Sequence, residues 1–151
     1  MIINIAEYYK ELEQTEKRSE IVWTELEGKR LLVTGASGMI GSYIIDLLMR
    51  HNKNSDKQIE VYALSRNREH IEERFKSREN LKSINIVEHD ISRPLIIDED
   101  VDFIIHAASN THPLEYSQKP VETITTNVIG LTIYMNMQED VENVELSYFL
   151  L

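Results

Sequence analysis

Three glycines at even spacing, Gly35, Gly38 and Gly41, are the residues of this sequence best suited to binding chemistry. The apolar run 31–33 precedes them, as in a strand buried on both faces of a parallel sheet, and apolar residues at helical spacing follow them. A strand, a glycine turn and a helix together direct free N–H groups and the positive end of the helix dipole at a phosphate. The pattern therefore predicts a nucleotide-binding loop, with an ordinary turn as the alternative.

Each glycine has its own predicted role. The first makes the tight turn, the second lets a pyrophosphate approach the backbone, and the third lets the helix pack close to the preceding strand. The spacing is Gly-x-x-Gly-x-x-Gly, which differs from the Gly-x-Gly-x-x-Gly of many dehydrogenases.

A second group of candidate binding residues, Ser65, Arg66 and Asn67, follows a predicted strand at 59–64. In dinucleotide-binding folds the residue at this place meets the adenosine ribose, and NAD-specific sites usually offer Asp or Glu there. A guanidinium pairs well with a 2′-phosphate, because it is a planar cation with several donors. Arg66 therefore favours NADP over NAD. The alternative is that Arg66 stacks on the adenine or lies in solvent.

The elements that must position these residues alternate between strand and helix. Further strands are predicted at 85–87, 103–106 and 146–151, and further helices at 68–80 and 114–136. This alternation predicts an α/β fold, a Rossmann-type doubly wound parallel sheet with strand order 3-2-1-4-5. The cofactor would lie at the switch point beyond the first and fourth strands.

Length and composition limit the possible functions. The chain has 151 residues, a net charge of −10 and no cysteine. The negative charge argues against a nucleic-acid partner, and the lack of cysteine is typical of a protein from the reducing cytoplasm. We expect neither a signal peptide nor a membrane span at the N-terminus, and we expect no metal site, because the five histidines have no metal-ligand spacing.

Residues 1–28 are predicted to form a helical arm, and residues 29–151 the dinucleotide-binding domain. Within the arm, residues 2–25 form an amphipathic helix whose apolar face includes Ile5, Tyr9 and Leu12. The arm could fold onto its own domain, or it could cover a neighbouring subunit or the sheet edge.

The segment 34–41, TGASGMIG, resembles the fingerprint of the extended short-chain dehydrogenase/reductases, the NAD-dependent epimerase/dehydratase family. The resemblance extends over about residues 29–130 and is to the dTDP-glucose 4,6-dehydratase/UDP-sugar epimerase group. It implies that Asp90 contacts the adenine amine, although an Asp there could also cap a turn. It also implies that the small residues after the fourth strand leave room for the cofactor, and that Asn127 braces the active-site backbone.

Motif and resemblance together imply a set of cofactor-binding residues. They are Gly35, Ala36, Ser37, Gly38, Met39, Ile40, Gly41, Ser65, Arg66, Asn67, Asp90, Ile91, Ala107, Ala108, Ser109 and Asn127.

No catalytic residue is predicted. Family members use a Tyr-x-x-x-Lys pair, and none of the seven tyrosines here precedes a lysine by four positions. His106 lies inside an apolar strand, which favours a hydrogen-bonded core histidine over a catalytic base. With the apolar tail 148–151, these features lead us to expect a truncated or frame-disrupted part of a longer enzyme.

The resemblance implies the cofactor half of a nucleotide-sugar dehydratase or epimerase, in which the cofactor takes a hydride from sugar C4 and returns it. The partners would be a dinucleotide, NAD or NADP, and a nucleotide sugar. Because a parallel sheet needs both faces covered, an incomplete one should expose apolar surface and form a homodimer. The alternatives are a non-catalytic dinucleotide-binding protein and a reductase of a non-sugar carbonyl.

Overall fold

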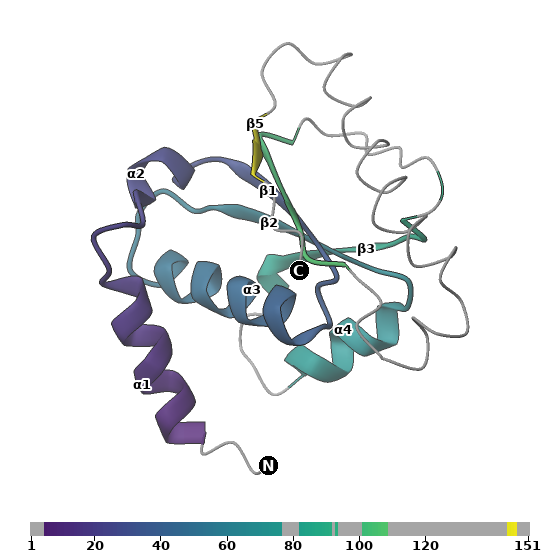
Figure 1. Cartoon of the computed structure of the whole chain (residues 1–151), viewed down its shortest axis with the longest axis horizontal. Helices are drawn as coiled ribbons and strands as arrows, with labels where there is room; N and C mark the ends of the chain where they lie inside the picture. The colour runs from purple at the N-terminus through teal and green to yellow at the C-terminus, as the bar shows by residue number, and fades with distance from the viewer. Residues whose placement is uncertain (1–4, 77–81, 92, 94–100, 109–144, 148–151) are drawn as a thin grey trace, which may run out of the picture.

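The computed structural model describes residues 5–76, 82–91, 93, 101–108 and 145–147 (Figure 1). In chain order its elements are α1 (Ile5–Glu16), α2 (Trp23–Leu26), β1 (Arg30–Thr34), α3 (Met39–Asn52), β2 (Glu60–Ser65), α4 (Arg68–Phe75), β3 (Ile84–Glu88), β4 (Phe103–His106) and β5 (Glu145–Ser147).

The five strands form one parallel sheet in the order β3-β2-β1-β4-β5, as the alternating pattern predicts. Leu31 of β1 lies opposite Val61 of β2 on one side and Phe103 of β4 on the other. The fourth strand has the predicted bounds. The fifth begins one residue earlier than predicted, at Glu145, and the described part ends at Ser147.

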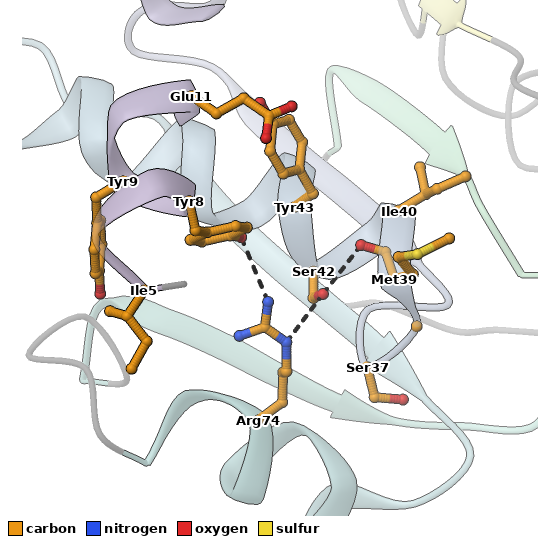
Figure 2. Close-up of a pocket in the computed structure, with 11 residues that line it drawn as sticks. Ile5, Tyr8, Tyr9, Glu11, Ser37, Met39, Ile40, Ser42, Tyr43 and Arg74 are labelled. Carbon is orange, nitrogen blue, oxygen red and sulfur yellow. Dashed lines mark hydrogen bonds between the residues drawn. The ribbon is translucent and has the colours of Figure 1, made fainter. Parts of the chain in front are cut away.

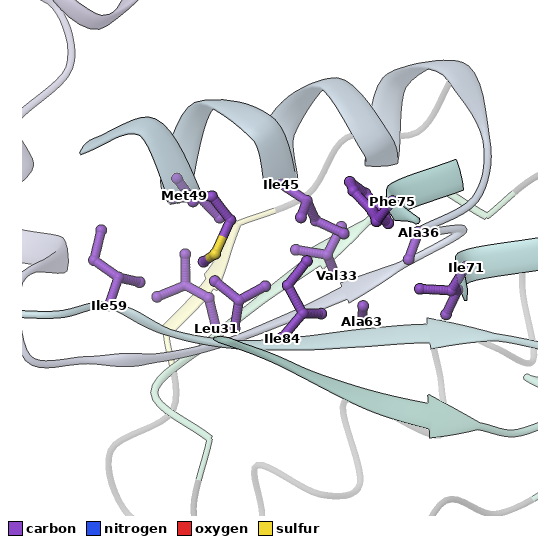
Figure 3. Close-up of a cluster of buried hydrophobic side chains, with 12 residues drawn as sticks. Leu31, Val33, Ala36, Ile45, Met49, Ile59, Ala63, Ile71, Phe75 and Ile84 are labelled. Atoms are coloured by element: carbon purple, nitrogen blue, oxygen red, sulfur yellow. The ribbon is translucent and has the colours of Figure 1, made fainter. Parts of the chain in front are cut away.

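The larger apolar core lies between the sheet and helices α3 and α4, which cover the same face (Figure 3). α3 contributes Ile45, Leu48 and Met49 at helical spacing, and α4 contributes Ile71 and Phe75, both fully buried. These side chains pack on residues of β1 and β2. Because α3 follows β1 and α4 follows β2, the first turns of both helices lie at the carboxyl edge of the sheet.

A second cluster lies on the opposite face, because successive strand side chains point to opposite sides. Its buried members are Leu32, Tyr62, Leu64, Ile91, Val101 and Ile104, each at most 6% exposed. The exposed apolar sheet surface expected from the sequence is therefore not found at these six residues. Self-association remains a prediction.

The arm differs from the predicted single helix. α1 ends at Glu16, and after a turn the short α2 begins at Trp23. The Trp23 indole Nε1 donates to the Glu16 carbonyl at 2.9 Å, which satisfies an acceptor that a helix end leaves without an intrahelical donor. The packing face also differs: Leu12 is buried, but Ile5 and Tyr9 are 72% and 45% exposed.

The face that packs is the one that carries Tyr8, Thr15 and Glu16, and it lies on α3. The Thr15 hydroxyl is 2.9 Å from the Tyr43 hydroxyl, and Arg50 Nε donates to Glu16 Oε2 at 2.7 Å. The arm therefore folds onto its own domain, the first of the two predicted arrangements. α3 lies between the sheet and α1 (Figure 1).

Other predicted boundaries shift or lie beyond the described residues. The helix predicted at 68–80 is described as far as Phe75, and residues 77–81 and the helix predicted at 114–136 lie outside the described ranges. In the described parts of the chain, no helix combines the length and apolarity needed to cross a membrane.

Candidate functional site

The first glycine makes the turn that follows β1. Gly35 has φ +64°, a conformation that L side chains rarely adopt, and a Cβ there would lie 2.5 Å from the Ala107 carbonyl oxygen. The turn therefore needs glycine for its backbone angle and for the close approach of the chain after β4. The predicted tight turn at Gly35 is confirmed.

The third glycine, Gly41, allows the close packing that we predicted, but it packs against the glycine loop and not against the preceding strand. A Cβ on Gly41 would lie 2.3 Å from the Gly35 carbonyl oxygen and 3.2 Å from the Ala36 Cα. The nearest backbone therefore belongs to the turn and not to β1. Any side chain here would push the first turn of α3 away from the loop that precedes it.

The N-terminal end of α3 is open. Gly38 is its N-cap, no side chain caps this end, and no acidic residue lies in the first turn. The Gly38 N–H is already bound to the Gly35 carbonyl at 2.9 Å, and the next helical residue, Met39, is 85% exposed. First-turn N–H groups lack intrahelical acceptors, so this end is suited to bind an anion through backbone donors and the helix dipole.

The end of β2 is joined to the glycine loop. The Ala36 N–H donates to the Leu64 carbonyl at 3.1 Å, and the Ser37 and Ser65 hydroxyls are 3.3 Å apart. Asn67 has a role that sequence reasoning missed: its Oδ1 accepts from the Glu69 N–H at 2.8 Å and caps α4. The cap was recognisable as an Asn two residues before a Glu at the start of a helix.

Arg66 lies between Ser65 and Asn67 in the sequence, and it is exposed. Within the described residues, no side chain or carbonyl pairs with its guanidinium. Its charge is thus available at the carboxyl end of β2.

The ends of β1 and β4 are joined through a threonine. The Thr34 hydroxyl is 2.9 Å from His106 Nδ1 and accepts from the Ala108 N–H at 3.3 Å. His106 is 3% exposed and is hydrogen-bonded through Nδ1, as the interpretation as a core histidine predicts. Thr34 was missed, although a polar residue at the end of an apolar strand is a recognisable signal.

The described candidate residues gather at one edge of the sheet. Ser65 ends β2, and residues 35–41, 66–67, 90–91 and 107–108 each follow the carboxyl end of a strand, where parallel α/β sheets bind ligands. Asp90 is half-buried, and the Ile91 side chain belongs to the second core cluster. Ser109 and Asn127 lie outside the described residues.

Residues 31–145 match the sequence profile of the NAD dependent epimerase/dehydratase family. The chain belongs to this family. The resemblance carried by the segment 34–41 is thus confirmed.

Two UDP-glucuronic acid decarboxylases are similar in sequence to this chain. UDP-glucuronic acid decarboxylase 3 of Arabidopsis thaliana is 36% identical over 107 residues, which are 67% of this chain and 28% of the plant protein. UDP-glucuronic acid decarboxylase 1 of Danio rerio is 35% identical over 122 residues, 80% of this chain and 27% of the fish protein. The epimerase/dehydratase chain thus spans less than a third of the length of these relatives.

Among solved structures, DesIV of Streptomyces venezuelae, a dTDP-glucose 4,6-dehydratase with NAD bound, is 25% identical, with a TM-score of 0.59. The superposition covers 78% of this chain and 38% of DesIV.

A groove of about 620 Å³ opens beside the glycine loop of the epimerase/dehydratase domain (Figure 2). Its walls are α1, the first turns of α3 and the end of α4. Arg74, which sequence reasoning did not select, lies in this groove and pairs with Asp46 at 3.3 Å. Among the described residues, no group of three His, Cys, Asp or Glu side chains is placed to hold a metal ion.

Burial lowers the pKa of His106 below its ordinary value, because desolvation disfavours the charged imidazole. The unfolded chain therefore takes up a proton at a higher pH than the folded domain. The titration of His106 leaves the free energy of unfolding at its full value above about pH 6.5. As the pH falls from there toward the pKa of the folded state, the free energy of unfolding declines by at most about 1.4 kcal/mol per pH unit.

We expect urea unfolding at a series of pH values between neutral and mildly acidic to show this slope for the wild-type chain. His106→Gln should flatten it, whereas His70→Gln, at an exposed position on α4, should leave it unchanged. Equal slopes for wild type and His106→Gln would contradict the statement that the lowered pKa of His106 causes this pH dependence.

Proposed function

We propose that this chain binds an NAD-type dinucleotide as the cofactor-binding part of a nucleotide-sugar dehydratase or epimerase. The observation that carries the proposal is the open N-terminus of α3, which follows the Gly35 turn where that turn lies against the Ala107 backbone. Family membership and the NAD bound to the similar DesIV protein support it.

The residues present fit the pyrophosphate of a dinucleotide. Side chains at Gly35 and Gly41 would collide with backbone, so the loop has the compact form that lets a pyrophosphate approach its N–H groups. Ala107 and Ala108, after β4, keep the path beyond the loop free of large side chains. When bound, the nicotinamide would supply reversible hydride transfer at sugar C4.

We further propose that these 151 residues bind the dinucleotide without turning over a nucleotide sugar, since none of the seven tyrosines precedes a lysine by four positions. A nucleotide sugar is proposed as a partner only for a protein of the relatives' full length, of which the aligned residues are 28%. Self-association is a further proposal. The exposed Ile5, Tyr9 and Met39 favour it, and light scattering on the purified chain measures it.

The test is a titration of the chain with NADH, followed by nicotinamide fluorescence. We expect saturable binding that ADP-ribose displaces, because the adenosine and pyrophosphate contacts are common to both ligands. An unchanged fluorescence, together with no heat of binding by calorimetry, would contradict the proposal.

The exposed guanidinium of Arg66 favours NADP over NAD within this proposal, because no described residue neutralises it where the ribose is expected. We expect Arg66→Ala to weaken NADPH binding about tenfold, the equivalent of one charge-assisted phosphate contact, and to leave NADH binding nearly unchanged. Arg68→Ala is the matched control, since Arg68 pairs with Glu72 at 2.8 Å on the exposed face of α4. If NADH binds more tightly than NADPH to the wild type, the preference is wrong.

A further inference from the structure

A continuous set of hydrogen bonds links the N-terminal arm to the first turn of α3. We call its members, Tyr8, Asp46, Arg74, Ser42 and the carbonyl of Met39, the arm network. Figure 2 shows all of them except Asp46.

At the arm end, the Tyr8 hydroxyl donates to Asp46 Oδ2 at 2.5 Å. One amino group of Arg74 donates to the same carboxylate oxygen at 3.3 Å and makes a longer contact of 3.5 Å with the Tyr8 hydroxyl. The Asp46 side chain is only 3% exposed. A buried carboxylate without partners is strongly destabilising, so both partners are held to it.

At the loop end, the Nε of Arg74 donates to the Ser42 hydroxyl at 3.1 Å, and this hydroxyl donates to the Met39 carbonyl at 3.2 Å. Ser42 is 1% exposed, and its N–H binds the Gly38 carbonyl at 3.0 Å. The network therefore ends on the backbone of the two residues that begin the open end of α3. Arg74 connects the two ends of the network, because its guanidinium contacts both the arm and Ser42.

The arm lies outside the family match, which begins at Leu31. It nevertheless forms a wall of the groove that reaches Ser37 and Gly38. We propose that the arm network positions the first turn of α3 for dinucleotide binding, with Tyr8, Arg74 and Ser42 as positioning residues that do not themselves touch the ligand. This inference rests on the proposed dinucleotide binding.

Two substitutions test the network from its two ends. Tyr8→Phe removes the hydroxyl at the arm, and Ser42→Ala removes the link to the Met39 carbonyl. We expect each to weaken NADH binding about fivefold, and the double variant to be little weaker than either alone, because both interrupt the same network. Affinities are compared where circular dichroism shows every variant fully folded, so that lost stability does not contribute.

Tyr9→Phe is the matched control. Tyr9 neighbours Tyr8 on the arm and is 45% exposed, and its hydroxyl binds no described residue. It should bind NADH like the wild type.

A second measurement uses the reciprocity of coupled binding. NADH should slow hydrogen exchange of the α1 amides in the wild-type chain, and this slowing should be absent from Ser42→Ala. Lowered melting temperatures with unchanged NADH affinity and unchanged arm exchange would show that the network is structural only, and would overturn the inference. A wild-type chain that binds no NADH would instead contradict the proposed function, and the inference with it.

Discussion

Replacing Gly35 by alanine is expected to remove about 3 kcal/mol of unfolding free energy and to abolish dinucleotide binding. Two effects add at this residue. Its φ of +64° is strained for any L side chain, and the added Cβ would lie 2.5 Å from the Ala107 carbonyl oxygen. All the atoms that the Cβ would meet are backbone atoms of Ala107 and Ala108, so the glycine loop or the chain after β4 must move. Urea unfolding and the NADH titration measure the two consequences.

Gly28 is the matched control for this substitution. It has a similar φ of +76°, but a Cβ there would meet no atom within 4 Å. Gly28→Ala should therefore show the backbone strain alone, about 1 kcal/mol, with unchanged NADH affinity. Equal losses for Gly28→Ala and Gly35→Ala would mean that the approach to Ala107 is not as close as the structure has it.

The second large effect is expected at Phe75, the residue that fixes the end of α4 on the sheet. Phe75 is fully buried in the larger core, and Phe→Ala substitutions at such sites remove about 4 kcal/mol. α4 also carries Arg74, whose guanidinium lies 5.3 Å from the centre of the Phe75 ring. We therefore expect Phe75→Ala to weaken the arm network as well as the core.

Lys76→Ala, one position further along, is the control. Lys76 is exposed and pairs with Glu73 on the surface, so its removal should change stability by less than about 0.5 kcal/mol. Differential scanning calorimetry of the two variants gives the comparison. A loss below about 1 kcal/mol for Phe75→Ala would show that α4 is not anchored as described.

Patterns that depend on neighbouring residues were predictable. The strand at Phe103–His106, the glycine turn and the order β3-β2-β1-β4-β5 follow from apolar periodicity, glycine spacing and the rules for parallel connections. The ends of helices were less predictable from the sequence. The predicted arm helix continued past Glu16, because its sequence contains no proline or glycine to stop it and the capping contact from Trp23 comes from a later turn.

The order of residues was enough to predict the fold, the family and the position of the candidate site at one edge of the sheet, because local periodicity and a short glycine motif encode them. Folding in three dimensions was needed to show which atoms the glycines avoid, which face of α1 packs, and that Arg74 joins the arm to the open end of α3. Those features arise from contacts between residues far apart in the chain, such as Gly35 with Ala107 and Tyr8 with Asp46. A pattern of neighbouring residues does not specify these distances, because they are set only when the chain folds.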